Sequence, residues 1–224
     1  MRFDFHITED IDTKGFGITF IDIDETLFNT FAKILVIKDG KVIKELSNSE
    51  YNNYRAKEGE SFDFSQFSDA ELFYRTSKPI EKMVKRATRI IKRAHAKGSR
   101  VIILTARGSF DKKDVFLNKF RQAGIPIDLV RVELSKNRDL SIAMEKKMTI
   151  MKYLNTGIYR RVRVFDDYIR TCRAFLHIKD DLPKETYTKI RDTYQIGFDV
   201  PDEELIKFEA WHVQSDGSIQ EIKQ

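Results

Sequence analysis

Acidic residues gather directly behind a short apolar run near the start of the chain. The segment ITFIDIDETLFNT covers residues 18–30, and its opening letters, ITFI, are typical of a buried strand. Asp22, Asp24 and Glu25 follow this run. Carboxylates crowded at the end of a strand repel one another and resist desolvation, so a folded chain tolerates them when they hold a cation. This segment is therefore the first candidate functional site.

Three further groups of polar residues follow expected strands or lie in an expected helix. In a doubly wound α/β sheet, ligands bind beyond the carboxyl ends of the strands, so residues at several strand ends converge. We therefore expect these groups to meet the first acidic segment. They are Thr105, Ala106 and Arg107 after the run RVIIL, Lys147 in a helical segment, and Asp166 and Asp167 after the run RVRVF.

An acidic cluster with a hydroxyl group and one or two cations suits phosphoryl transfer assisted by Mg²⁺. This ion prefers octahedral oxygen ligands and keeps several waters, so two or three carboxylates suffice. Beside it a carboxylate can attack phosphorus and form an aspartyl-phosphate. The aspartate two residues further on can protonate the leaving oxygen and later deprotonate water. Thr105 and Lys147 would hold phosphate oxygens, where the loss of one donor costs roughly 10²- to 10³-fold in rate.

The motifs DIDET, LTAR and FDD, in this order and with a lysine before the last, resemble those of the haloacid dehalogenase superfamily of phosphohydrolases. The resemblance implies that Asp22 is the nucleophile and Asp24 the general acid and base. It also makes Thr105 the phosphate-binding hydroxyl and Lys147 the cation beside it. The adjacent Lys146 is the alternative, but the run KMTIM, with Ile150 three residues after Lys147, favours Lys147.

The resemblance also implies a Mg²⁺ site, to which Asp24 would contribute its backbone carbonyl. It covers roughly residues 15–30 and 80–178. Glu25 stands where the family more often has Gly, although Glu occurs there in the branch that dephosphorylates the C-terminal domain of RNA polymerase. The implied metal-binding residues are Asp22, Asp24, Asp166 and Asp167.

Arg107 bears on the substrate. The letters TAR are similar to the corresponding motif in the phosphatase domain of phage polynucleotide kinase-phosphatases, which has a small hydroxyl residue, one spacer and then Arg. Arg107 and its neighbour Ala106 would then contact a substrate phosphate, which an arginine can grip with two parallel hydrogen bonds. The alternative is that Arg107 pairs within the protein, with Asp167 or Asp24.

Strands alternating with helices predict an α/β fold, a Rossmann-like three-layer sandwich with a parallel sheet. Residues 78–98 show the apolar period of an amphipathic helix, with Pro79 near its start and Gly98 after its end. Residues 33–46 predict a β-hairpin around Asp39 and Gly40. The expected organisation is a catalytic core at 1–30 and 80–182, a small cap or flap inserted at 31–79, and a C-terminal helix and hairpin extension at 183–224.

Composition limits the function classes. The 224 residues are 41% hydrophobic and 33% charged, with one cysteine and four histidines that lack metal-ligand spacing, so disulfides and a zinc site are not expected. Apolar runs are too short to cross a bilayer and no signal-peptide pattern is present, so we expect a cytoplasmic protein without membrane contact. No P-loop, dinucleotide-binding or GxSxG motif occurs.

Basic residues are concentrated between 81 and 125, where thirteen basic side chains face three acidic ones. The helix expected at 80–97 carries many of them. Its basic face either contacts nucleic acid weakly or is simply a solvated surface. The aromatic residues of the insertion likewise either stack a base or pack the insertion onto the core.

These patterns predict a Mg²⁺-dependent phosphomonoesterase that acts through an aspartyl-phosphate, on a nucleotide or a nucleic-acid terminal phosphate. A phosphoprotein phosphatase and a sugar-phosphate phosphatase are alternatives. A different class of protein, a nucleic-acid-binding module that keeps the fold without the chemistry, would have no need of Asp22.

Overall fold

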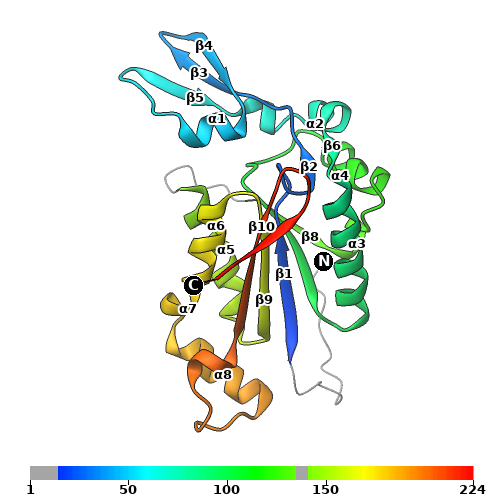
Figure 1. Cartoon of the computed structure of the whole chain (residues 1–224), viewed down its shortest axis with the longest axis vertical. Helices are drawn as coiled ribbons and strands as arrows, with labels where there is room; N and C mark the ends of the chain where they lie inside the picture. Colours follow the sequence, from blue (N-terminus) through cyan, green and yellow to red (C-terminus); the bar gives the residue numbers. More distant parts are fainter. Residues whose placement is uncertain (1–14, 135–140, 224) are drawn as a thin grey trace.

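A six-stranded, mostly parallel sheet forms the centre of the computed structural model, which describes residues 15–134 and 141–223 (Figure 1). The strand order is β11-β10-β9-β1-β7-β8, and only β11 runs antiparallel to its neighbour. The strands are β1 (Phe16–Ile21), β7 (Arg100–Thr105), β8 (Arg131–Leu134), β9 (Tyr159–Asp166), β10 (Lys207–Val213) and β11 (Ile219–Ile222). The predicted α/β fold with a parallel sheet is confirmed.

Helices cover both faces of this sheet. Successive side chains of a strand point to opposite faces, so Ile21 and Ile103 lie in one apolar cluster while Phe20 and Ile102 lie in the other. This burial on both faces explains the continuous apolar run of β7. The first cluster includes α3 (Glu81–Ala96) and α4 (Lys113–Gln122), and the second includes α5 (Ile142–Leu154), α6 (Ile169–Leu176), α7 (Ile178–Asp181), α8 (Lys184–Tyr194) and α9 (Asp202–Leu205).

The predicted helix at 78–98 is α3. Its buried residues recur every three or four positions, at Met83, Val84, Ala87, Ile91 and Ala94. This spacing places one apolar stripe against the sheet and leaves the charged residues outside. The helix ends before Gly98, whose φ of +68° is accessible to glycine without a steric cost.

The insertion forms a small antiparallel sheet of order β4-β3-β5, which Figure 1 shows beyond the carboxyl end of β1. The predicted hairpin is confirmed: both turn residues, Asp39 and Gly40, have positive φ, as a type I′ turn requires. Ile34, Val36 and Leu46 form the apolar centre of this unit. Its elements are β3 (Ile34–Lys38), β4 (Lys41–Leu46), α1 (Asn48–Asn53) and β5 (Glu60–Asp63).

Parts of the predicted insertion and of the predicted C-terminal extension pack against the main core. The end of the predicted insertion joins the main core, because Phe73 of α2 (Ala70–Thr76) packs edge-on against Phe28. The predicted C-terminal hairpin is present, and its first strand, β10, pairs with β9 and extends the main sheet. Two short strands, β2 (Phe28–Asn29) and β6 (Lys78–Pro79), pair where the chain leaves and re-enters the core, and 3₁₀ turns lie at Ser65–Phe67 and Ile127–Leu129.

Residues 1–14 of the predicted core lie outside the described residues. In the part of the chain that the structure describes, no helix combines the length and the apolar character needed to cross a membrane.

Candidate functional site

Three aspartates meet at the carboxyl ends of β1 and β9. Each of Asp22, Asp166 and Asp167 offers a carboxylate oxygen, and these oxygens lie within 4.8 Å of one another. The two strands are adjacent and parallel, and the Asp22 N–H donates to the Phe165 carbonyl at 3.0 Å, so both chain segments end at the same level. Asp22 and Asp166 are buried. This cluster could hold a metal ion, because carboxylate oxygens are ligands for hard cations.

A buried lysine from α5 lies between two of these carboxylates. The Lys146 Nζ is 2.7 Å from Asp22 Oδ1 and 2.7 Å from Asp166 Oδ2. The lysine residue is only 3% exposed, so its charge is shared with the two carboxylates rather than with water. Such charge-assisted hydrogen bonds hold all three groups in a fixed geometry.

The prediction that Lys147 lies at this site was wrong. Lys147 instead forms an ion pair with Asp181 of α7, outside the cluster. Adjacent residues of an α-helix are turned by about 100° from one another, so only one of two neighbouring lysines faces the sheet. The buried Ile150 and Leu154 stand four and eight residues after Lys146, and this spacing marks Lys146 as the inward-facing lysine.

The cluster has too little positive charge for its carboxylates. Burial raises the pKa of Asp22 to about 7, Asp166 and Asp24 add to the effect, and Lys146 opposes it. Burial, together with Asp166 and Asp22, raises the pKa of Asp167 to about 9. Burial alone would lower the pKa of Lys146, but the two aspartates that it contacts raise it above its usual value. The lysine is therefore charged here, whereas burial favours the protonated forms of Asp22 and Asp167.

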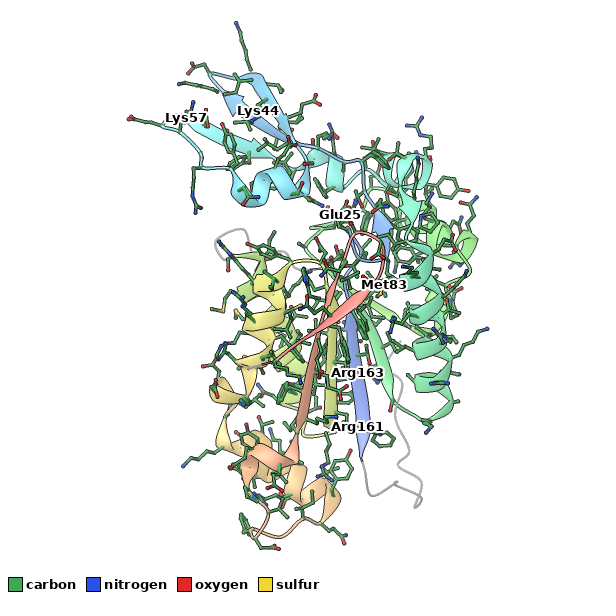
Figure 2. All side chains as sticks on the ribbon, in the orientation of Figure 1. Glu25, Lys44, Lys57, Met83, Arg161 and Arg163 are labelled. Atoms are coloured by element: carbon green, nitrogen blue, oxygen red, sulfur yellow. The ribbon has the colours of Figure 1, made fainter. Side chains whose placement is uncertain are left out.

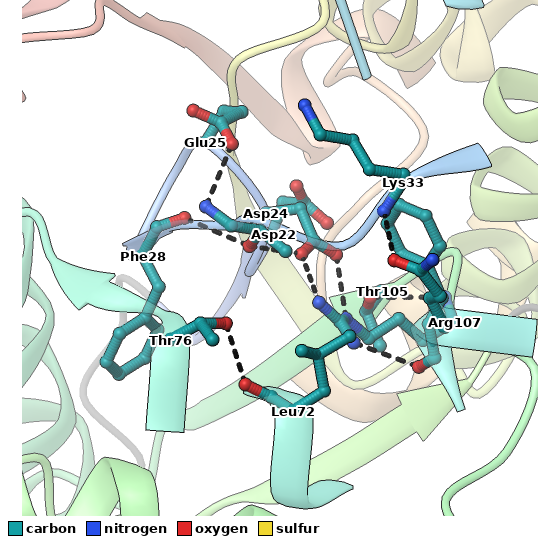
Figure 3. Close-up of polar contacts among 12 residues, drawn as sticks. Asp22, Asp24, Glu25, Phe28, Lys33, Leu72, Thr76, Thr105 and Arg107 are labelled. Atoms are coloured by element: carbon teal, nitrogen blue, oxygen red, sulfur yellow. Dashed lines mark hydrogen bonds and ion pairs between the residues drawn. The ribbon is translucent and has the colours of Figure 1, made fainter. Parts of the chain in front are cut away.

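Asp24 and Arg107 form a separate ion pair, in which Arg107 is buried and Asp24 is partly buried (Figure 3). The Arg107 Nε and Nη2 lie 3.0 and 2.6 Å from Asp24 Oδ2 and Oδ1, and the Thr30 hydroxyl donates to the same Oδ1 at 2.6 Å. The Asp24 carboxylate is not part of the cluster of three. The predicted metal ligand from Asp24 is its backbone carbonyl, and this stays a prediction.

Arg107 pairs with Asp24 within the protein, which is the second of the two predicted alternatives, and its contact with a substrate phosphate stays a prediction. Arg107 is 2% exposed, and its remaining terminal nitrogen, Nη1, donates to the Phe67 carbonyl at 2.9 Å. The guanidinium also faces the rings of Phe73 and Phe110. All three guanidinium nitrogens thus have partners within the protein.

Thr105 and Ala106 follow the neighbouring strand, β7. Thr105 is fully buried, and its hydroxyl oxygen accepts a hydrogen bond from the Arg107 N–H at 3.2 Å. Ala106 is exposed. Because β7 pairs in parallel with β1, Thr105 ends its strand at the edge of the sheet where the aspartates gather, as the sequence predicted.

The segment that follows Asp22 forms a tight turn. The N–H groups of Leu27 and Phe28 both donate to the Ile23 carbonyl, at 2.8 and 3.0 Å. Figure 2 shows Glu25 at the end of the main sheet that faces the small sheet, and its φ is +55°. Thr26, fully buried, accepts a hydrogen bond from the Asp167 N–H at 3.0 Å and so joins this turn to the end of β9.

Sequence reasoning missed the parts of Thr26, Thr30 and His212, the last of which contacts the Asp167 carbonyl. The letter T in DIDET indicated a residue of interest at position 26, but no local pattern connects His212 to the cluster.

Comparison of the chain with protein-family models, curated proteins and solved structures found no match. The chemistry of the site therefore rests on the geometry of its own residues.

Proposed function

We propose that this chain is a Mg²⁺-dependent phosphomonoesterase of the haloacid dehalogenase type that forms a phospho-enzyme at Asp22. The observation that carries the proposal is the buried cluster in which Lys146 bridges Asp22 and Asp166 and leaves Asp167 beside them. When ionised, three carboxylates face one ammonium group, so a divalent cation would balance the charge. An all-oxygen donor set suits Mg²⁺.

The residues divide the chemistry among them. Asp22 Oδ1 accepts the hydrogen bond from Lys146, which leaves its other carboxylate oxygen to attack phosphorus. As the new oxygen–phosphorus bond forms, the bond to the leaving oxygen breaks, and Asp24 supplies the proton that this oxygen needs. Lys146 and Thr105 would hold the phosphate oxygens where negative charge develops. A Mg²⁺ ion bound by Asp22, Asp166 and Asp167 would reduce the repulsion between carboxylate and phosphate.

The second step regenerates the enzyme. Water attacks the phosphoryl group, passes a proton to Asp24 and releases inorganic phosphate as the bond to Asp22 breaks. In the present arrangement both Asp24 oxygens already accept hydrogen bonds from Arg107. Protonation of Asp24 would forfeit its charge pairing with Arg107, so we infer that this pair opens when Asp24 acts as the acid. Because Arg107 also contacts the Phe67 carbonyl, we infer that opening moves the end of the insertion.

The proposed substrate is a nucleotide or a nucleic-acid end. Arg107 no longer supports this choice, because it is engaged within the protein. The remaining support is the basic outer face of α3. The amino-terminal end of this helix adjoins the turn that follows Asp24, because the Ile80 N–H donates to the Leu27 carbonyl at 2.9 Å. The small sheet beyond the strand ends is proposed to act as a flap over the site.

The test is release of inorganic phosphate with and without Mg²⁺. The substrates are an aryl phosphate, nucleoside monophosphates, 3′- and 5′-phosphorylated oligonucleotides, a phosphopeptide and sugar phosphates. Mg²⁺-dependent release is expected, and Asp22→Asn, which keeps the shape of the side chain, should abolish it. If a folded Asp22→Asn variant keeps its activity, Asp22 is not the nucleophile. The preferred substrate distinguishes a nucleotide or nucleic-acid phosphatase from a phosphoprotein phosphatase and a sugar-phosphate phosphatase.

The two adjacent lysines provide a matched pair of variants. Lys146→Met should lower the rate at least about 10²-fold, as expected for the loss of a donor to developing charge. Lys147→Met removes an ion pair with the exposed Asp181, outside the cluster, and should leave the rate near that of the natural chain. Equal losses in the two variants would contradict the assignment of Lys146.

A further inference from the structure

A chain of hydrogen bonds links the C-terminal strand to the acidic cluster. The His212 Nε2, on β10, lies 2.8 Å from the Asp167 carbonyl oxygen, and the Gln214 Nε2 lies 2.8 Å from His212 Nδ1. A carbonyl oxygen only accepts, so Nε2 carries the proton and Nδ1 accepts from the Gln214 amide. The two contacts are thus consistent with a single neutral tautomer of the ring.

The Asp167 peptide groups are held from two sides. Its N–H donates to the Thr26 hydroxyl at 3.0 Å, and its carbonyl accepts from His212. The Asp167 carboxylate, in contrast, receives no hydrogen bond from any residue that the structure describes, although it belongs to the cluster of three. The backbone is therefore the part of Asp167 that hydrogen bonds hold in place.

Pairing between strands does not provide this support. The ladder between β9 and β10 ends at the pair Asp166 and His212, so Asp167 lies one residue beyond the last paired position. Past that point the Asp167 carbonyl is contacted by a side chain, that of His212. The contact is thus a property of a histidine at this position and not of the sheet in general.

We propose that His212 is a positioning residue for the metal-binding carboxylate of Asp167, and that Gln214 fixes the tautomer that allows it. The inference rests on the proposed function in one respect, that Asp167 binds the metal ion. With both its peptide groups fixed, Asp167 presents its carboxylate toward Asp22 and Asp166 before the ion arrives. Partners that orient ligands in this way typically change metal affinity by about 10- to 100-fold. The C-terminal hairpin would then be an integral part of the metal centre.

The experiment measures Mn²⁺ binding to the full chain without substrate, by the electron paramagnetic resonance signal of free Mn²⁺. His212→Phe keeps an aromatic ring but removes the donor, and should weaken binding about 10- to 100-fold. His212→Gln restores a side-chain N–H and should recover most of the affinity. His95→Phe, at an exposed histidine of α3, is the control and should bind Mn²⁺ like the natural chain.

Asp167→Asn separates failure of this inference from failure of the proposed metal centre. If Asp167→Asn weakens Mn²⁺ binding while His212→Phe does not, the positioning role is refuted and the metal centre stands. If Asp167→Asn binds Mn²⁺ as tightly as the natural chain, the metal centre itself is refuted, and the inference with it. Should His212→Phe fail to fold, Gln214→Leu leaves the ring in place, and the proposal then requires a measurable loss of affinity in that variant.

Discussion

Glu25 adopts a backbone conformation that most side chains avoid. Its φ of +55° lies in the left-handed region, which costs an L-residue roughly 1–2 kcal/mol. Two hydrogen bonds offset this cost: the Glu25 N–H donates to the Phe28 carbonyl at 2.8 Å, and Glu25 Oε1 accepts from the Thr30 N–H at 3.0 Å. The turn that presents Asp24 thus requires a conformation that glycine would adopt freely.

We therefore expect Glu25→Gly to be more stable than Glu25→Ala by about 1 kcal/mol, measured by urea unfolding. Both variants lose the bond to Thr30, so their difference isolates the backbone. The control is the same pair of substitutions at Lys92, an exposed position within α3. There the order should reverse, because glycine in a helix interior is about 1 kcal/mol less favourable than alanine. Equal stabilities at position 25 would mean that the turn is not strained.

At the scale of residues, the sequence predicted which types of residue meet at the site, but it did not identify every one of those residues correctly. Asp22, Asp166 and Asp167 converge because parallel strands end at one edge, which their positions after apolar runs already indicated. The choice between Lys146 and Lys147 depended on the rotation of one helix about its axis. Arg107 had two chemically reasonable partners, and only the folded geometry selects Asp24.

The outer surface of α3 carries a row of positive charge, which we call the α3 ridge. Among the described residues, only Lys82 of this row has an acidic partner, Asp216. Most of the ridge is solvent-exposed, and its exposed side chains are almost entirely charged rather than apolar, which suits a polyanion better than the interior of a membrane. The ridge consists of Lys82, Lys85, Arg86, Arg89, Lys92, Arg93 and Lys97.

We expect the triple charge reversal Lys85→Glu, Arg89→Glu and Lys92→Glu to weaken binding of a phosphorylated oligonucleotide. Binding is measured by fluorescence anisotropy in the Asp22→Asn background, so that the oligonucleotide is not consumed. The slope of log K against log salt should fall by about 2–3, because each phosphate contact contributes about 0.7–0.9. A matched reversal of Lys152, Lys184 and Lys189, on α5 and α8, should change binding much less. Equal effects of the two reversals would identify the α3 ridge as an ordinary solvated face.

At the scale of elements, local patterns were sufficient for α3 and for the hairpin around Asp39 and Gly40. Both depend on periods and turn residues that the sequence displays directly. The second hairpin was also visible, but its pairing with β9 was not. A run of alternating residues indicates a strand without specifying which sheet edge it joins, and that choice placed His212 beside Asp167.

At the scale of the whole molecule, the buried charged residues of the candidate site lie between the two apolar clusters that cover the faces of the main sheet. Asp166 ends β9 between the clusters on either side of the sheet, and the sole cysteine of the chain, Cys172 on α6, lies directly behind it. The Cys172 thiol faces the Asp166 carbonyl, with Sγ and oxygen 3.7 Å apart. A probe of this thiol therefore reports on the elements that support the candidate metal centre.

Cys172 should react with a thiol reagent only when the protein opens. It has no exposed surface, and burial, together with Asp166, raises the pKa of its thiol well above the usual range, so little thiolate exists near pH 8. A metal ion that binds only the folded state stabilises that state by about 2.7 kcal/mol at 100 times its dissociation constant. If only the open state reacts, the labelling rate follows the population of that state. Saturating Mg²⁺ lowers this population and should therefore slow labelling of the native chain by about 10²-fold.

The measurement is the rate of reaction with a chromogenic disulfide reagent at pH 8, across a series of Mg²⁺ concentrations. Asp167→Asn is the control: it keeps Cys172 and loses a carboxylate of the cluster, so its labelling rate should respond little to Mg²⁺. Rapid labelling of the folded natural chain would contradict the burial of Cys172. Slow labelling that Mg²⁺ does not change would show that no ion stabilises the junction between the two layers, and the charge surplus of the aspartates would then be relieved by protons instead.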